Sequence, residues 1–303
     1  MGGKRNKEAI ITIVGFLGAG KTTLLKHLAR VYPQQGLSPY VILNDYENAQ
    51  LDARQFTEQI SANTIRALSG SCICCSGLQS LRDTVNQIPQ RDNGITLIEA
   101  NGTTDACSLA GFLGIGLDDR FLPPVQVSVV NINSWQRREK HNELEASQVQ
   151  LSSLIILSHL DKAPVERQNE VMEHLRKLNP DAKIIPMAEL DAGLLTRLHP
   201  SENEAKRIDH EKSHWSSCSI DLPEMPNEES IRLLCRKIPE SILRVKGCVR
   251  LTGSATYTYF ERTPEGDLSI RKFEGNPNMG AKLLTVGLGS DKSFLMDLVK
   301  EYV

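Results

Sequence analysis

Lys21 and Thr22 close the segment of this sequence that most clearly fits a chemical task. They end the run Gly15-x-x-x-x-Gly20-Lys21-Thr22, which has the spacing of a phosphate-binding P-loop. Glycines at Gly15, Gly18 and Gly20 would let the backbone curl so that successive N–H groups converge on phosphate oxygens. In such a loop the lysine reaches the β- and γ-phosphates, and the threonine hydroxyl ligates Mg²⁺. The pattern therefore predicts a nucleoside triphosphate site.

A second acidic group follows the apolar run at residues 95–98, which is typical of a buried strand. Glu99 ends that run, and Gly102 follows three residues later. In a P-loop protein a carboxylate in this place can hold the Mg²⁺ shell or position the attacking water. The N–H of Gly102 can point toward the γ-phosphate. We expect Lys21 and Glu99 to be the catalytic residues.

Asp161 is the residue that we expect to select the base. An aspartate carboxylate accepts two hydrogen bonds from the N1–H and the exocyclic amine of guanine, and adenine offers no such pair. Sites built on paired, buried hydrogen bonds can discriminate by factors on the order of 10⁴. The alternative is that Asp161 only caps the turn at residues 162–164. Guanine recognition is the interpretation that we favour.

Three cysteines stand close together as Cys72-x-Cys74-Cys75. Thiolates are soft ligands that suit Zn²⁺, Cu(I) or a similar ion. Structural zinc sites normally have four protein ligands, so a site with three thiolates leaves one position open, which suits a metal that is handed on. The alternative is a set of packed or redox-active thiols. The other cysteines are isolated and are expected in the core: Cys107, Cys218, Cys235 and Cys248.

Strands that alternate with helices must position these residues. Short apolar runs predict strands at residues 10–14, 40–43, 95–98, 125–130, 154–157 and 182–185. Helices between most of these strands predict a mostly parallel sheet with its ligand-binding loops along one edge. The P-loop, the cysteine cluster, Glu99 and Asp161 all follow strands, so we expect them to share that edge. The charged helix expected at residues 137–145 is interpreted as a solvated face.

The length of 303 residues predicts two domains. We place a P-loop domain at residues 1–198, a polar linker at 199–213 and a smaller α+β domain with a mostly antiparallel sheet at 214–303. The net charge of -2 gives no reason to expect nucleic acid as a partner. No apolar run approaches membrane-spanning length, and the first residues lack the pattern of a signal peptide. These features predict a cytoplasmic protein without a membrane partner, in which cysteines are thiols or metal ligands.

Together these residues resemble the CobW family of P-loop GTPases. The matching elements are the run from Gly15 to Thr23, Cys72 to Cys75, Glu99-x-x-Gly102, a degenerate guanine motif at 158–161 and the segment at 244–247. The resemblance implies an α/β P-loop NTPase fold, with a mostly parallel sheet flanked by helices and a smaller C-terminal α+β domain. It also implies that Ala19, Thr23 and His159 contribute to the nucleotide site.

The same resemblance implies a GTP-hydrolysing metallochaperone that uses GTP, Mg²⁺ and a transition metal, Zn²⁺ or Co²⁺, held at Cys72, Cys74 and Cys75. GTP and GDP would be its nucleotides, and a client metalloprotein or a metal-cofactor pathway enzyme its partner. The family usually has Lys where His159 stands, which keeps an ATP-using P-loop protein open as an alternative. A second alternative is a nucleotide- and metal-sensing module with negligible hydrolysis. A homodimer is also left open.

Overall fold

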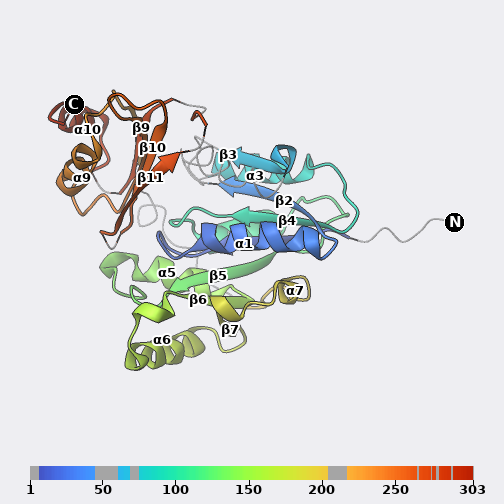
Figure 1. Cartoon of the computed structure of the whole chain (residues 1–303). Helices are drawn as coiled ribbons and strands as arrows, with labels where there is room; N and C mark the ends of the chain where they lie inside the picture. Colours follow the sequence, from blue (N-terminus) through green and yellow to red (C-terminus); the bar gives the residue numbers. More distant parts are fainter. Residues whose placement is uncertain are drawn as a thin grey trace. The chain divides into compact units, whose positions relative to one another are not determined.

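The chain divides into two compact units, residues 1–213 and 214–303, and each is described by itself (Figure 1). The computed structural model describes residues 7–44, 61–68, 75–203, 217–264, 266–273, 275–277, 280–287 and 289–302. The proposed linker at 199–213 stays a prediction, because residues 204–213 lie outside this set. None of the described helices combines the length and the apolar character needed to cross a membrane.

The first unit is built on a seven-stranded sheet with the strand order β3-β2-β4-β1-β5-β6-β7. Its strand pairs are parallel. The bounds are β1 Ala9–Val14, β2 Ser38–Asn44, β3 Ile65–Leu68, β4 Gly94–Glu99, β5 Val125–Asn131, β6 Leu154–Ser158 and β7 Lys183–Pro186. The predicted α/β class is therefore confirmed.

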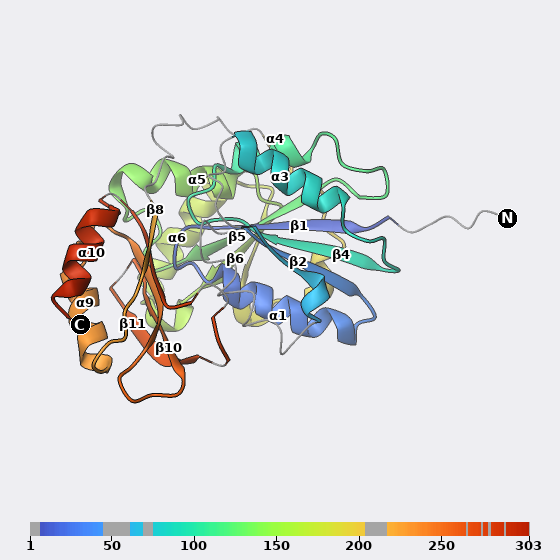
Figure 2. The same ribbon diagram turned by 90° about the horizontal axis from the view of Figure 1, so that it is seen from above.

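Helices cover both faces of this sheet, which is why its strands are continuous apolar runs. In β1, Ile11 packs in the cluster that contains the apolar residues of α1, whereas its neighbour Ile10 packs with α3 and α4. Figure 2 shows α1 on one side of the sheet and α3 and α4 on the other. The helices are α1 Lys21–Gln34, α3 Cys75–Asn86, α4 Ala106–Leu113, α5 Asn142–Gln150, α6 Val165–Leu178 and α7 Ala192–Leu195.

The second unit is a five-stranded antiparallel sheet with the order β11-β10-β9-β12-β8. Two helices, α9 and α10, share a core with apolar residues of one sheet face. The bounds are β8 Ser217–Asp221, α9 Glu228–Lys237, β9 Arg244–Arg250, β10 Tyr257–Arg262, β11 Leu268–Phe273, β12 Lys282–Val286 and α10 Lys292–Lys300. The predicted small α+β arrangement is confirmed.

The second face of this antiparallel sheet carries a half-buried ion pair. Arg244 Nη2 lies 2.9 Å from Glu261 Oε1, and the Tyr259 hydroxyl donates to Glu261 Oε2 at 2.9 Å. Burial opposes ionisation of Glu261, but the charges of Lys246 and Arg244 outweigh it and lower its pKa to about 2. The cluster is polar, and two of its members, Tyr259 and Lys246, are only 1% exposed.

Two local features differ from the sequence-based expectations. Helix α6 was not anticipated, because Pro164 is a turn signal that here is the N-cap of the helix. The expected helix at 137–145 begins only at Asn142, after a 3-10 turn η2 at Glu139–His141. Gln136 and Glu139 have left-handed backbone angles, with φ of 55° and 49°, which no regular helix could contain.

Candidate functional site

The P-loop joins the end of β1 to the start of α1. Gly15 has φ 142°, and a Cβ at this position would overlap the main-chain carbonyl of Val129 on β5. Gly20 is the N-cap of α1 with φ 100°, a conformation that side chains rarely adopt. Gly18 has φ 76°, and Ala19 is 2% exposed. The glycines are therefore required by the curvature of the loop and by the approach of β5.

Lys21 lies folded over this loop. Its ammonium donates to the main-chain oxygens of Gly15 at 2.8 Å and Phe16 at 3.1 Å, and the residue is only 4% exposed. Carbonyl oxygens hold the charge close to the loop, at the positive N-terminal end of α1. Phosphate oxygens would offer stronger, charge-assisted hydrogen bonds to the same group.

Thr22 and Glu99 meet across the edge of the sheet. The Thr22 hydroxyl donates to Glu99 Oε1 at 2.7 Å, because β4 pairs with β1 in parallel and Glu99 lies beside Ile13. A hydroxyl and a carboxylate oxygen are the hard ligands that Mg²⁺ prefers, so this donor set fits that ion. Thr23 is exposed on the first turn of α1.

Gly102 brings the loop after β4 against the P-loop. A Cβ here would stand 2.6 Å from the backbone nitrogen of Leu17 and 2.6 Å from its Cδ2. Only a glycine permits this approach. The loop that carries Glu99 and Gly102 is therefore packed directly on the phosphate-binding loop.

The segment after β6 also reaches the P-loop. The Ser158 hydroxyl donates to the main-chain oxygen of Ala19 at 2.7 Å, and His159 Nδ1 lies 3.0 Å from Ser158 Oγ. His159 is left-handed, with φ 58°, and Asn133 on the loop after β5 donates to its main-chain oxygen at 3.0 Å. Asp161 follows in an exposed 3-10 turn, η3 Leu160–Lys162.

Sequence reasoning did not single out the Ser158 contact or the turn after β7. Met187 begins that turn, η4 Met187–Glu189, and its Cε lies 3.6 Å from where a Cβ on Gly20 would stand. The only signal in the sequence was position, since both segments follow strands of a parallel sheet. Ser158 lies at the start of the degenerate guanine motif, but neither that motif nor the residue type of Met187 predicts a contact with the P-loop.

The interpretation of residues 137–145 as a solvated face is wrong for two of its charged residues. Arg138 and Glu145 have side chains that are 8% and 5% exposed and lie 3.5 Å apart. The Arg138 guanidinium is 4.2 Å from the centre of the Phe16 ring in the P-loop, and the His141 ring stacks on Phe16 as well. Arg137 is exposed as expected. The interpretation failed because Arg138 pairs with Glu145 and packs over the Phe16 ring, so neither side chain faces solvent.

The predicted transition-metal ligands are not tested. Cys72 and Cys74 lie outside the described residues, and Cys75 opens α3 with its side chain outside the description. Within the described part of the chain, no group of three or more His, Cys, Asp or Glu residues could hold a metal. Of the isolated cysteines, Cys107 is half-buried, whereas Cys218, Cys235 and Cys248 are buried as expected.

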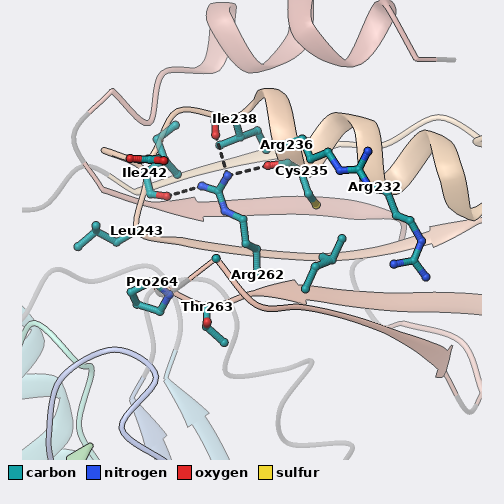
Figure 3. Close-up of a pocket in the computed structure, with 12 residues that line it drawn as sticks. Arg232, Cys235, Arg236, Ile238, Ile242, Leu243, Arg262, Thr263 and Pro264 are labelled. Carbon is teal, nitrogen blue, oxygen red and sulfur yellow. Dashed lines mark hydrogen bonds between the residues drawn. The ribbon is translucent and has the colours of Figure 1, made fainter. Parts of the chain in front are cut away.

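A separate cavity of about 510 Å³ lies in the second unit, between the end of α9 and the turn after β10 (Figure 3). Arg262 points into it, but its guanidinium donates to the main-chain oxygens of Cys235 at 2.6 Å and Ile242 at 2.6 Å, among others. Burial raises the pKa of the Cys235 thiol to about 12, which favours the neutral thiol near neutral pH.

One protein-family model matches more than half of the chain. Residues 9–186 match the family described as "CobW/HypB/UreG, nucleotide-binding domain". The zinc chaperone YjiA of Escherichia coli K12 is 28% identical over 200 residues, covering 63% of this chain and 61% of that protein. The zinc-regulated GTPase metalloprotein activator 1 of Dictyostelium discoideum is 23% identical over 243 residues, covering 65% of this chain and 51% of that protein.

Two solved structures are also similar to this chain. One is Zn(II)-bound YjiA GTPase from E. coli, with a TM-score of 0.46, 18% identity and coverage of 98% and 99%. The other is HypB from Helicobacter pylori in complex with nickel, with a TM-score of 0.41, 15% identity and coverage of 62% and 82%. The match to the two relatives by sequence spans 61% and 51% of their lengths.

Proposed function

Because the chain belongs to the CobW/HypB/UreG family of nucleotide-binding domains, we propose that it is a GTP-binding and GTP-hydrolysing metallochaperone. In this proposal it binds a transition metal, zinc or cobalt, and delivers it to a client metalloprotein or a metal-cofactor pathway. The observation that carries the proposal is the contact of Thr22 with Glu99 at 2.7 Å beside Lys21. The names of the sequence relatives refer to zinc, which favours zinc over cobalt.

Phosphate binding falls to the P-loop in this proposal. The N–H groups from Gly18 to Thr23 surround the phosphates, and the Lys21 ammonium exchanges its two carbonyl partners for β- and γ-phosphate oxygens. Thr22 and Glu99 would hold Mg²⁺, which when bound neutralises phosphate charge. Glu99 also orients the attacking water, and Gly102 presents its N–H to the γ-phosphate. Intrinsic turnover is expected to be slow, because the site as proposed contains no arginine that would stabilise the charge of the transition state.

Base selection is assigned to Asp161, with His159 packing along the base. The support is positional, since Ser158 ties the start of this segment to Ala19 in the P-loop at 2.7 Å. The carboxylate of Asp161 has no hydrogen bond or ion pair among the described residues and is exposed, so its oxygens are available to guanine. ATP is the alternative nucleotide, because the family's usual lysine is replaced by His159.

The metal is assigned to Cys72, Cys74 and Cys75, which come between β3 and the body of α3. Strand β3 ends and helix α3 begins at the edge of the parallel sheet that carries the ligand-binding loops. The bound metal and the γ-phosphate would therefore influence each other. Ordering of such loops by the γ-phosphate and its Mg²⁺ is the usual switch in GTPases. A homodimer remains compatible with the proposal.

The decisive experiment is a competition titration of Zn²⁺ and of Co²⁺ against the apo, GDP-bound and GTP-analogue-bound protein. Linkage requires metal and nucleotide to change each other's affinity by one common factor, typically about 5- to 150-fold. The variant with Ser at positions 72, 74 and 75 should lose tight binding, and Cys107→Ser is the matched control that should retain it. Equal metal affinity in all three nucleotide states would refute the chaperone cycle.

A measurement of GTP hydrolysis distinguishes the metallochaperone from a nucleotide- and metal-sensing module. A nucleotide- and metal-sensing module would show the same linkage but no turnover of GTP, with or without metal. Release of phosphate that depends on Lys21 therefore supports the enzyme, and its absence supports the sensing module.

A further inference from the structure

One glutamine of α5 holds the loop between β4 and α4. Gln148 on α5 uses its Nε2 group to donate to the main-chain oxygens of Gly102 at 3.2 Å and Thr104 at 3.0 Å. The same loop abuts Leu17 at Gly102 and is bonded to Thr22 through Glu99. The proposed catalytic loop thus contacts both the P-loop and α5.

Gln148 is itself fixed in place. It is 1% exposed, and its main-chain oxygen accepts hydrogen bonds from Gln126 Nε2 at 2.9 Å and Ser152 Oγ at 2.8 Å. Gln126 belongs to β5, the strand next to β1. The main chain of Gln148 is therefore tied to β5, and its buried side-chain amide is held by its bonds to Gly102 and Thr104.

Two buried polar atoms at this contact have no hydrogen-bond partner among the described residues. They are Gln148 Oε1 and Thr104 Oγ1, and Thr104 is 2% exposed. A buried polar atom without a partner is unfavourable, and native structures hold few of them. Gln148 Oε1 is an acceptor, and the Thr104 hydroxyl is a donor. The two residues are already joined by the hydrogen bond from Gln148 Nε2 to the main-chain oxygen of Thr104.

We propose that Gln148 is a positioning residue for the loop that carries Glu99 and Gly102, and that the Thr104 hydroxyl donates to Gln148 Oε1 when a nucleoside triphosphate is bound. The inference rests on the proposed function. A γ-phosphate that draws the Gly102 N–H toward it moves the loop, and Thr104 moves with it. That second arrangement satisfies both atoms, whereas the arrangement without phosphate leaves both unsatisfied. Thr104 and Gln148 therefore favour the triphosphate-bound state.

Thr104→Val tests this directly, because it removes a hydroxyl that makes no hydrogen bond in the present arrangement. We expect unchanged GDP affinity and a melting temperature no lower than that of the wild type. We expect the affinity for a non-hydrolysable GTP analogue and the kcat for GTP to fall about tenfold, as for the loss of one hydrogen bond. Thr285→Val is the matched control, since it removes another buried hydroxyl without a partner, in β12 of the second unit. It should change neither nucleotide affinity nor kcat.

Gln148→Met gives a second test of the proposal. It keeps the length of the side chain and removes both hydrogen bonds, so the ratio of GTP-analogue affinity to GDP affinity should fall with kcat. A purely structural glutamine would lower the melting temperature and leave that ratio unchanged. Wild-type ratios in both Thr104→Val and Gln148→Met overturn the inference. Failure of the wild-type protein to bind GTP analogues would instead defeat the proposed function, and the two failures are distinguishable.

Discussion

Gly102→Ala is the smallest change that should separate nucleotide binding from hydrolysis. The added Cβ would stand 2.6 Å from the Leu17 nitrogen, where ordinary contact begins at 3.4 Å, so the two loops must separate by about 0.8 Å. Glu99 lies three residues earlier and is bonded to Thr22 at 2.7 Å, so it should move with the loop. Displacements of about 1 Å in a catalytic arrangement can cost on the order of 10²-fold in rate. We expect kcat for GTP to fall by roughly 10- to 100-fold.

The assay is phosphate release under saturating GTP, with GDP affinity measured by a fluorescent analogue. GDP affinity should stay close to that of the wild type, because Lys21 and the P-loop amides are not displaced. Gly111→Ala is the matched control. It lies inside α4, and no atom stands within 4 Å of its added Cβ. It should stabilise the protein by about 0.5–1 kcal/mol and leave kcat unchanged. A wild-type kcat in Gly102→Ala would refute the placement of this loop against the phosphates.

Three further outcomes are expected. Lys21→Ala should abolish phosphate release with an unchanged circular dichroism spectrum, because it removes the cation that faces the phosphates; retained turnover would exclude the P-loop as the active site. Fluorescent GTP and GDP should bind more tightly than ATP and ADP, and Asp161→Ala should erase the difference; equal affinities in the wild type would remove guanine reading. Glu261 has a folded pKa of about 2 against 4.5 for the free group. Its ionised carboxylate therefore stabilises the folded protein by roughly 3 kcal/mol above pH 4.5, and this contribution is lost as pH falls toward 2. The free energy of unfolding, measured in urea, should depend less on pH in Glu261→Gln; an unchanged pH dependence would contradict this.

Local sequence was sufficient for the P-loop because its contacts are local. Lys21 bonds carbonyls five and six residues away, and the positive φ values of Gly15, Gly18 and Gly20 follow from a loop that glycine alone accommodates well. The strands were also predictable, since residues buried on both sheet faces form short apolar runs. The meeting of Thr22 with Glu99, 77 residues apart, was anticipated because parallel strands place their carboxyl ends at one edge.

Helix α6 and the segment after β5 show where composition misleads. Pro164 ends a turn and starts a helix with the same geometry, so the residue alone does not say which follows. Charged residues at 137–145 suggested solvent, yet Arg138 and Glu145 neutralise each other in the interior. A charged side chain needs either water or an oppositely charged partner, and only the fold determines which of the two it meets.

The sequence by itself determined the phosphate loop, the alternation of strands and helices, and the existence of a second, antiparallel unit. Each of these features depends on residues that are close together along the chain. Only the tertiary structure decided that Ser158 holds Ala19, 139 residues away, and that Gln148 holds Gly102, 46 residues away. These contacts depend on the strand order β3-β2-β4-β1-β5-β6-β7. A hydrophobic pattern gives the faces of a strand but not the strand beside it, and a lone Ser or Gln acquires its role only from what that neighbour brings within hydrogen-bonding distance.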